Sequence, residues 1–143
     1  MDRWKYFEVT HATHGLMNPL SPPRIDALGE ALRLGAGHRV LDVACGHGVM
    51  MQQWHERFGA TGVGVEASPY TAARARTLAA DRAPRAIEIV EGRGEDFATD
   101  ERFDVACCLG AAWIWGAYRG ALEALSRFCK PGGAVVSGEP YWR

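Results

Sequence analysis

The sequence predicts an α/β protein with a mostly parallel sheet and helices on both of its faces. Short apolar runs alternate with helix-like segments from residue 39 to residue 137, and this alternation is typical of βαβ units. The runs are apolar at successive positions, as in strands that are buried on both faces. The chain has 143 residues, which is the size of one domain.

The individual elements follow from apolar spacing and from glycine and proline. Ile25, Leu28 and Leu32 repeat at helical spacing after Pro23, and Gly35 follows them, so a helix is expected between the proline and the glycine. Downstream helices are expected at 49–58, 69–83 and 120–129. Strands are expected at 39–44, 61–66, 87–91, 103–109 and 134–137, the last after a tight turn at Pro131-Gly132-Gly133.

Composition excludes several classes of function. Sixteen Lys and Arg residues face seventeen Asp and Glu residues, so no net charge draws the protein to nucleic acid or to an anionic membrane. No apolar run is long enough to cross a membrane, and residues 1–15 contain no signal-peptide core, so a cytoplasmic protein is expected. Cys45, Cys107, Cys108 and Cys129 form no CxxC pair, so we expect reduced thiols and no metal site.

An acidic residue and a glycine-rich turn end the first expected strand. Asp42 precedes Gly46 and Gly48, but Met51 stands where a dinucleotide-binding loop has its third glycine. A carboxylate beside this loop suits a cationic or amine-bearing ligand better than a pyrophosphate. Glu66 ends the second strand, where an acid accepts hydrogen bonds from ribose hydroxyls. A nucleoside ligand follows, and either NAD or S-adenosylmethionine would satisfy this pattern.

Five motifs in order decide between these ligands. They are Val40–Gly48, Gly64–Ser68, Glu91–Asp96, Phe103-Asp104-Val105, and Leu125–Gly133 with its Pro-Gly-Gly. In this order they resemble class I S-adenosylmethionine-dependent methyltransferases, over about residues 24–142. Ala44 replaces the first glycine of the family's D/E-x-G-x-G-x-G motif, and Arg93 stands where the family often has aspartate.

The resemblance implies a Rossmann-like three-layer sandwich with sheet order 3-2-1-4-5 and a set of cofactor-binding residues. Gly46, Gly48 and Ala44 would bring the backbone against the methionine part of S-adenosylmethionine, and Asp42 would hold the loop or the cofactor ammonium. Glu66 would bind the ribose hydroxyls. The adenine would lie beside Ala67, Gly94, Glu95 and Asp96, and the sulfonium beside Leu109, Gly110 and Ala111.

The acceptor side is less defined. If the acceptor needs a general base, the candidates are His14, Glu139 and Tyr141, with His11 and His47 less favoured. Trp113 and Trp115 follow the fourth strand, where acceptors bind in this family, and their rings could hold a flat acceptor or the sulfonium. The Asn/Asp-Pro-Pro-aromatic motif of base-amine methyltransferases is missing there, which favours a small-molecule acceptor over nucleic acid.

The ends of the chain complete the prediction. Residues 1–23 are interpreted as a lid or substrate segment and residues 24–143 as a methyltransferase core that stops after strand five, without the two further strands usual in this family. The chain looks most like uncharacterised bacterial methyltransferases that share His14-x-x-Met17-Asn18-Pro19-Leu20-Ser21 and Gly138-Glu139-Pro140-Tyr141-Trp142. A bare strand-five edge would favour a homodimer, a domain swap or poor solubility.

Two alternative functions remain open from the sequence. One is a cofactor-binding fragment or subunit that is inactive alone, and the other is a nicotinamide-dependent oxidoreductase.

Overall fold

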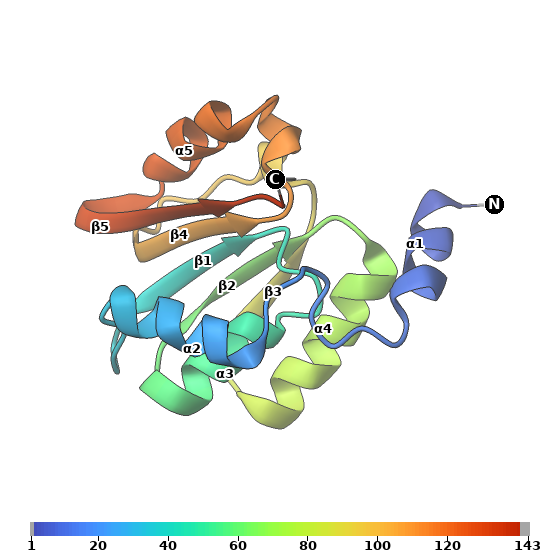
Figure 1. Ribbon diagram of the computed structural model, residues 1–143, viewed down its shortest axis with the longest axis horizontal. Helices are drawn as coiled ribbons and strands as arrows, with labels where there is room; N and C mark the ends of the chain where they lie inside the picture. Colours follow the sequence, from blue (N-terminus) through green and yellow to red (C-terminus); the bar gives the residue numbers. More distant parts are fainter. Residues whose placement is uncertain (1, 141–143) are drawn as a thin grey trace.

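The computed structural model describes residues 2–140, and in them one parallel sheet has the order β3-β2-β1-β4-β5 (Figure 1). All four strand pairs are parallel. The strands are β1 (Arg39–Val43), β2 (Thr61–Glu66), β3 (Ile87–Glu91), β4 (Phe103–Leu109) and β5 (Cys129–Gly138). The helices are α1 (Arg3–His11), α2 (Pro22–Ala31), α3 (Val49–Phe58), α4 (Pro69–Arg82) and α5 (Tyr118–Ser126), with 3-10 turns η1 (Gly94–Asp96) and η2 (Ala112–Trp115).

Helices cover both faces of this sheet, which confirms the predicted α/β sandwich. α2, α3 and α4 lie on one face, and α5 lies on the other (Figure 1). Neighbouring residues of β1 serve opposite faces, because Leu41 packs with Phe103 and Leu125 under α5, whereas Val40 packs with Trp54 of α3. A strand needs apolar side chains at successive positions only when both faces are covered.

The strand register brings the functional ends of the strands together. Val43 of β1 pairs with Val65 of β2, and Asp42 pairs with Cys107 of β4. The three strands therefore finish at the same edge of the sheet, where the loop after each strand begins. In open α/β sheets ligands bind at this edge.

An N-terminal helix, α1, was not predicted. Charged residues and aromatics alternate along it without an apolar stripe, and none of its residues is buried. It is capped by Asp2, whose side chain accepts a hydrogen bond from the Trp4 amide. Contacts with α4 hold it: the Lys5 ammonium lies 4.9 Å from the ring centroid of Tyr70, and Arg74 donates to the Ala12 carbonyl at 2.8 Å.

Several element boundaries differ from the prediction. β5 begins at Cys129 and not at Ala134, and Pro131-Gly132-Gly133 forms an irregularity inside this strand: the register shifts there between Phe103 and Val105, and Gly132 has φ +81°. α5 ends at Ser126 and not at 129. α2 includes both Pro22 and Pro23, because the first turn of a helix needs no backbone N–H donors.

β5 lies at one edge of the sheet within residues 2–140. Dimerisation or domain swapping through this edge stays a prediction. None of the helices in the described part of the chain combines the length and the hydropathy that crossing a membrane requires.

Candidate functional site

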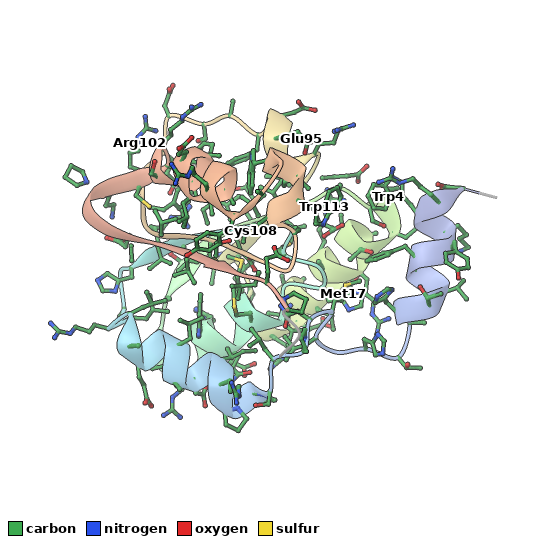
Figure 2. The ribbon with its side chains drawn as sticks, turned by 45° about the horizontal axis from the view of Figure 1, so that its top comes forward. Trp4, Met17, Glu95, Arg102, Cys108 and Trp113 are labelled. Carbon is green, nitrogen blue, oxygen red and sulfur yellow. The ribbon has the colours of Figure 1, made fainter. Side chains whose placement is uncertain are left out.

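A cavity of about 610 Å³ lies where β1, β2 and β4 end. Its inner wall is formed by the residues that follow these strands, and its outer wall by α1 and by the segment from Gly15 to Asn18. Figure 2 shows Trp4 and Met17 from this outer wall, with Trp113 and Glu95 from the loops beyond the strands. One concave site therefore contains residues from the beginning, the middle and the last third of the chain.

Most of the residues predicted to bind a cofactor meet in this cavity. Those that line it are Asp42, Ala44, Gly46, Glu66, Ala67, Gly94, Glu95, Leu109 and Gly110, together with the predicted substrate residue Trp113. They come from three separate motifs and from the segment that begins at the end of β4, and the shared edge of the sheet brings them together.

The other predicted site residues lie elsewhere. Gly48 is the N-cap of α3, at φ +69°, and Asp96 lines a separate hollow along β3. Trp115 packs half-buried against the core under α5. The backbone carbonyl of His14 is bonded to His47 Nδ1 at 3.1 Å. Tyr141 lies outside the described residues.

Glu139, a predicted base, has a structural partner. Its Oε1 accepts a hydrogen bond from the Ala112 amide at 2.5 Å, at the first residue of η2. Trp113 is the next residue of that turn. The carboxylate therefore anchors the turn that presents Trp113, and among the described residues it does not line the cavity.

The glycine loop has a specific backbone geometry. Ala44, Gly46 and Gly48 all have positive φ, at +63°, +57° and +69°. Glycine adopts this conformation without the steric conflict that a Cβ creates. Ala44 is thus the loop's strained position, which explains why the family motif has glycine there.

Glu66 fastens this loop to the end of β2. Its Oε2 accepts a hydrogen bond from the Gly46 amide at 3.0 Å, and its Oε1 accepts one from the Ser68 amide at 2.9 Å. Burial raises the pKa of the Glu66 carboxyl, and these two amide hydrogen bonds partly oppose that rise. The carboxylate also lines the cavity, so the same group organises the loop and faces the site.

Asp42 is a buried acid whose carboxylate accepts few hydrogen bonds. It is 4% exposed, and among the described residues the one hydrogen bond that its carboxylate accepts comes from the Cys107 thiol, at 3.6 Å. Burial raises the pKa of Asp42 to about 7; the nearby Glu66 charge adds to this rise, and the Cys107 hydrogen bond opposes it. A cation in the cavity would stabilise this carboxylate in its charged form.

Sequence reasoning missed several residues of the cavity. Arg3, Trp4 and Phe7 come from α1, and Met17 and Asn18 follow it. Asp2 is a recognisable N-cap residue and could have indicated the helix, but no pattern placed that helix over the strand ends.

His47, which the sequence offered as a less favoured base, does line the cavity. It is buried, and its pKa is lowered mainly because of burial and the nearby Arg74 charge.

The four cysteines are free thiols, and the pKa of each is raised, mainly by burial. Cys107 and Cys108 are buried, and burial raises the pKa of both thiols, to about 12 for Cys108. Over residues 2–140 no group of three or more His, Cys, Asp or Glu side chains could hold a metal ion.

Comparison with known proteins identifies the family. The family model described as "Methyltransferase domain" matches residues 40–133, from β1 to the start of β5. The chain belongs to this methyltransferase domain family. The match covers the glycine loop, Glu66 and the residues after β4, so the family assignment rests on the part of the chain that forms the inner wall of the cavity.

Several proteins similar to this chain are longer than it. The chain is 35% identical to the uncharacterized protein YjhP of Escherichia coli K12, over 100% of this chain and 58% of YjhP. It is 31% identical to a ubiquinone biosynthesis O-methyltransferase of Pseudomonas syringae, over 83% of this chain and 51% of that enzyme. A Geobacter sulfurreducens SAM-dependent methyltransferase, crystallised with S-adenosyl-L-homocysteine, superposes with a TM-score of 0.92 at 36% identity, over 100% of this chain and 57% of that one. The chain therefore spans little more than half the length of these relatives.

Proposed function

We propose that this protein binds S-adenosylmethionine and takes part in methyl transfer to a small-molecule acceptor. The observation that carries the proposal is Asp42, a buried carboxylate that faces the cavity and whose only hydrogen-bond partner within residues 2–140 is a thiol. S-adenosylmethionine has a cationic ammonium and a cationic sulfonium, so its charge complements this wall. The family match and the Geobacter methyltransferase complex support the same ligand.

Two glycines of the cavity lining pack closely against other protein side chains. At Gly46 an added Cβ would lie 2.9 Å from Met17 Sδ, and at Gly94 it would lie 2.4 Å from Val43 Cγ1. Both positions need glycine for close approach, and both line the cavity. Asp42 would bind the ammonium, Glu66 the ribose hydroxyls, and Ala67, Gly94 and Glu95 the adenine. Leu109 and Gly110 would lie beside the sulfonium.

When bound, the cofactor supplies an activated methyl group, and the protein's task is to orient the acceptor and to exclude water. Trp113 and the outer wall would hold the acceptor. Glu139 and His14 do not line the cavity in the described residues, and their contacts favour positioning roles over proton transfer.

Calorimetry with S-adenosylhomocysteine tests cofactor binding. We expect one site per chain in the wild type, and at least tenfold weaker binding in Asp42→Asn. Arg119→Ala is the matched control, because Arg119 is exposed on α5 and does not line the cavity. Absence of binding to a folded wild-type chain would overturn the proposal.

A second candidate is a methyltransferase core that binds the cofactor but is inactive alone. It is favoured by the length of the chain relative to YjhP and the Geobacter enzyme. An acceptor screen by S-adenosylhomocysteine release, with full-length YjhP assayed in parallel, separates the two. Turnover by both proteins supports the first function, whereas cofactor binding with turnover by YjhP alone supports the second. The nicotinamide alternative requires saturable NAD(P)H binding and receives no support from the family match.

A further inference from the structure

We propose that the acceptor is a flat aromatic or conjugated molecule that carries a negative charge. It would lie at the mouth of the cavity between the indole rings of Trp4 and Trp113, with its anionic group beside the guanidinium of Arg3. The inference rests on the proposed function and specifies its acceptor class. Three observations carry it: the separation of charge along the cavity, the aromatic side chains that line it, and the contacts that hold the turn of Trp113 in place.

Charge is divided between the two walls of the cavity. Asp42 and Glu66 are on the inner wall, at the ends of β1 and β2. Two cationic side chains belong to the lining, Arg3 and Arg93. Arg93 forms ion pairs with two acids of η1, whereas Arg3 has no ion pair with any acid in residues 2–140. A cationic ligand at the inner wall and an anionic one near Arg3 would therefore each meet complementary charge.

Asp2, the acid next to Arg3, is engaged elsewhere. Its Oδ1 accepts a hydrogen bond from the Trp4 amide at 3.0 Å, and its Oδ2 accepts one from the Tyr70 hydroxyl at 3.2 Å. The Arg3 guanidinium lies 4.5 Å from the ring centroid of Trp4. The cation is thus held on an aromatic surface with its hydrogen-bond donors left for a ligand, as is typical of sites that bind planar carboxylates.

Aromatic side chains line the cavity from two elements that are far apart in the sequence. Trp4 and Phe7 of α1 pack edge to face, with ring centroids 6.3 Å apart and an interplanar angle of 89°. Trp113 comes from the turn after β4 and is 66% exposed (Figure 2). All three line the cavity. A large apolar ring this exposed at the mouth of a cavity indicates a ligand surface.

The position of Trp113 is built into the fold. The Glu139 carboxylate holds the first residue of η2, and Ile114 beside Trp113 packs into the core under α5. Rigid aromatic rings lose little conformational entropy when they stack on a flat ligand. A saturated ring of the same size would lack the flat face that stacking requires.

Three matched probes test the proposal on the protein saturated with S-adenosylhomocysteine. The first is 2-naphthoate, which is flat and anionic. The second is 2-naphthamide, which is flat and neutral, and the third is decahydro-2-naphthoate, which is anionic and not flat. Calorimetry should give the tightest binding for 2-naphthoate and at least about fivefold weaker binding for the other two, as expected from losing one charge contact or one stacking contact.

Variants assign each preference to its residue. Arg3→Ala should bind 2-naphthoate and 2-naphthamide equally, and Trp113→Ala should bind 2-naphthoate and its saturated analogue equally. Arg119→Ala and Tyr118→Ala are the controls, because both residues are exposed on α5 and do not line the cavity; both should retain the wild-type order. Thermal melting checks that each variant is folded.

The outcomes separate the two proposals. Binding of S-adenosylhomocysteine with no preference among the three probes would overturn the acceptor class and leave the cofactor function standing. Failure to bind S-adenosylhomocysteine at all would overturn the proposed function itself. Equal loss of naphthoate binding in the Arg3 and Arg119 variants would show that Arg3 acts only through the overall charge of the protein.

Discussion

The two walls of the cavity differ in how the fold holds them. The inner wall belongs to the sheet: Asp42 and Glu66 are buried, and backbone amides fix the carboxylate of Glu66. The outer wall is α1 and the segment after it, where no residue of the helix is buried and exposed polar contacts with α4 supply the attachment. The inner wall is thus tied to the stability of the whole domain, whereas the outer wall rests on contacts that open locally at little cost.

The largest effect is expected from Asp42→Asn on the inner wall. It should weaken S-adenosylhomocysteine binding about 10- to 100-fold, the equivalent of about 1.4–2.8 kcal/mol, because the neutral amide can still accept a hydrogen bond but no longer attracts the ligand ammonium by its charge. In the wild type, binding should strengthen as pH rises through about 7, where the ligand-free Asp42 loses its proton. The variant should lack this step. Calorimetry between pH 6 and 8 measures both effects.

The same substitution should act on stability in the opposite direction. Between about pH 4 and 7 the unfolded chain has released the Asp42 proton while the folded chain retains it, so the ligand-free wild type loses stability as pH rises. Asp42→Asn should therefore be more stable than the wild type at pH 8 and nearly equal near pH 4. Urea unfolding at the two pH values checks the sign, and an equal gain at both would contradict the assignment.

Gly94→Ala tests how tightly the inner wall is packed. The new Cβ would lie 2.4 Å from Val43 Cγ1 and 2.8 Å from Ile114 Cδ1, so the η1 segment must move away from β1. Overpacking of this kind destabilises by about 1–3 kcal/mol. Gly92→Ala is the control, because nothing lies within 4 Å of its Cβ position. Chemical unfolding should give a lower free energy of unfolding for Gly94→Ala than for Gly92→Ala. Equal values would show that the η1 segment can shift to accommodate the methyl group without loss of stability.

Arg74→Ala addresses the outer wall. It removes the hydrogen bond to the Ala12 carbonyl, which is exposed, so global stability should change by less than about 0.5 kcal/mol. Hydrogen exchange of residues 3–18 should nevertheless become faster, and S-adenosylhomocysteine should bind a few-fold more weakly. Arg119→Ala should change neither. An equal change of exchange across the whole sheet would contradict a locally held wall.

How far the sequence predicts the molecule follows the same division. The inner wall was predictable, because apolar runs define parallel strands, and parallel strands bring Asp42 and Glu66 to one edge. For the outer wall the sequence predicted only a lid or substrate segment at residues 1–23. It did not predict α1 or its place, because α1 has no apolar stripe and its position depends on tertiary contacts with Tyr70 and Arg74. Glu139 shows a further limit: an acid near a site suggests a base, and only the structure shows that it caps the turn carrying Trp113.

The last prediction concerns the one loop position where this chain departs from its family's glycine pattern. Ala44 has φ +63°, a conformation that disfavours any residue with a Cβ by about 1–2 kcal/mol. Ala44→Gly removes this strain but adds about 0.4–1 kcal/mol of chain entropy to the unfolded state. The variant should therefore be more stable than the wild type by about 0.8 kcal/mol, the difference between the midpoints of these two ranges.

Ala111→Gly is the matched control for this last prediction, because Ala111 also lines the cavity but has φ −142°. It gains no relief of strain and should be destabilised. Denaturant unfolding of both variants isolates the contribution of the left-handed backbone. Destabilisation of both by the same amount would mean that the loop holds Ala44 without strain. The glycine that the family has at this position would then serve the close approach of a ligand and not the backbone conformation.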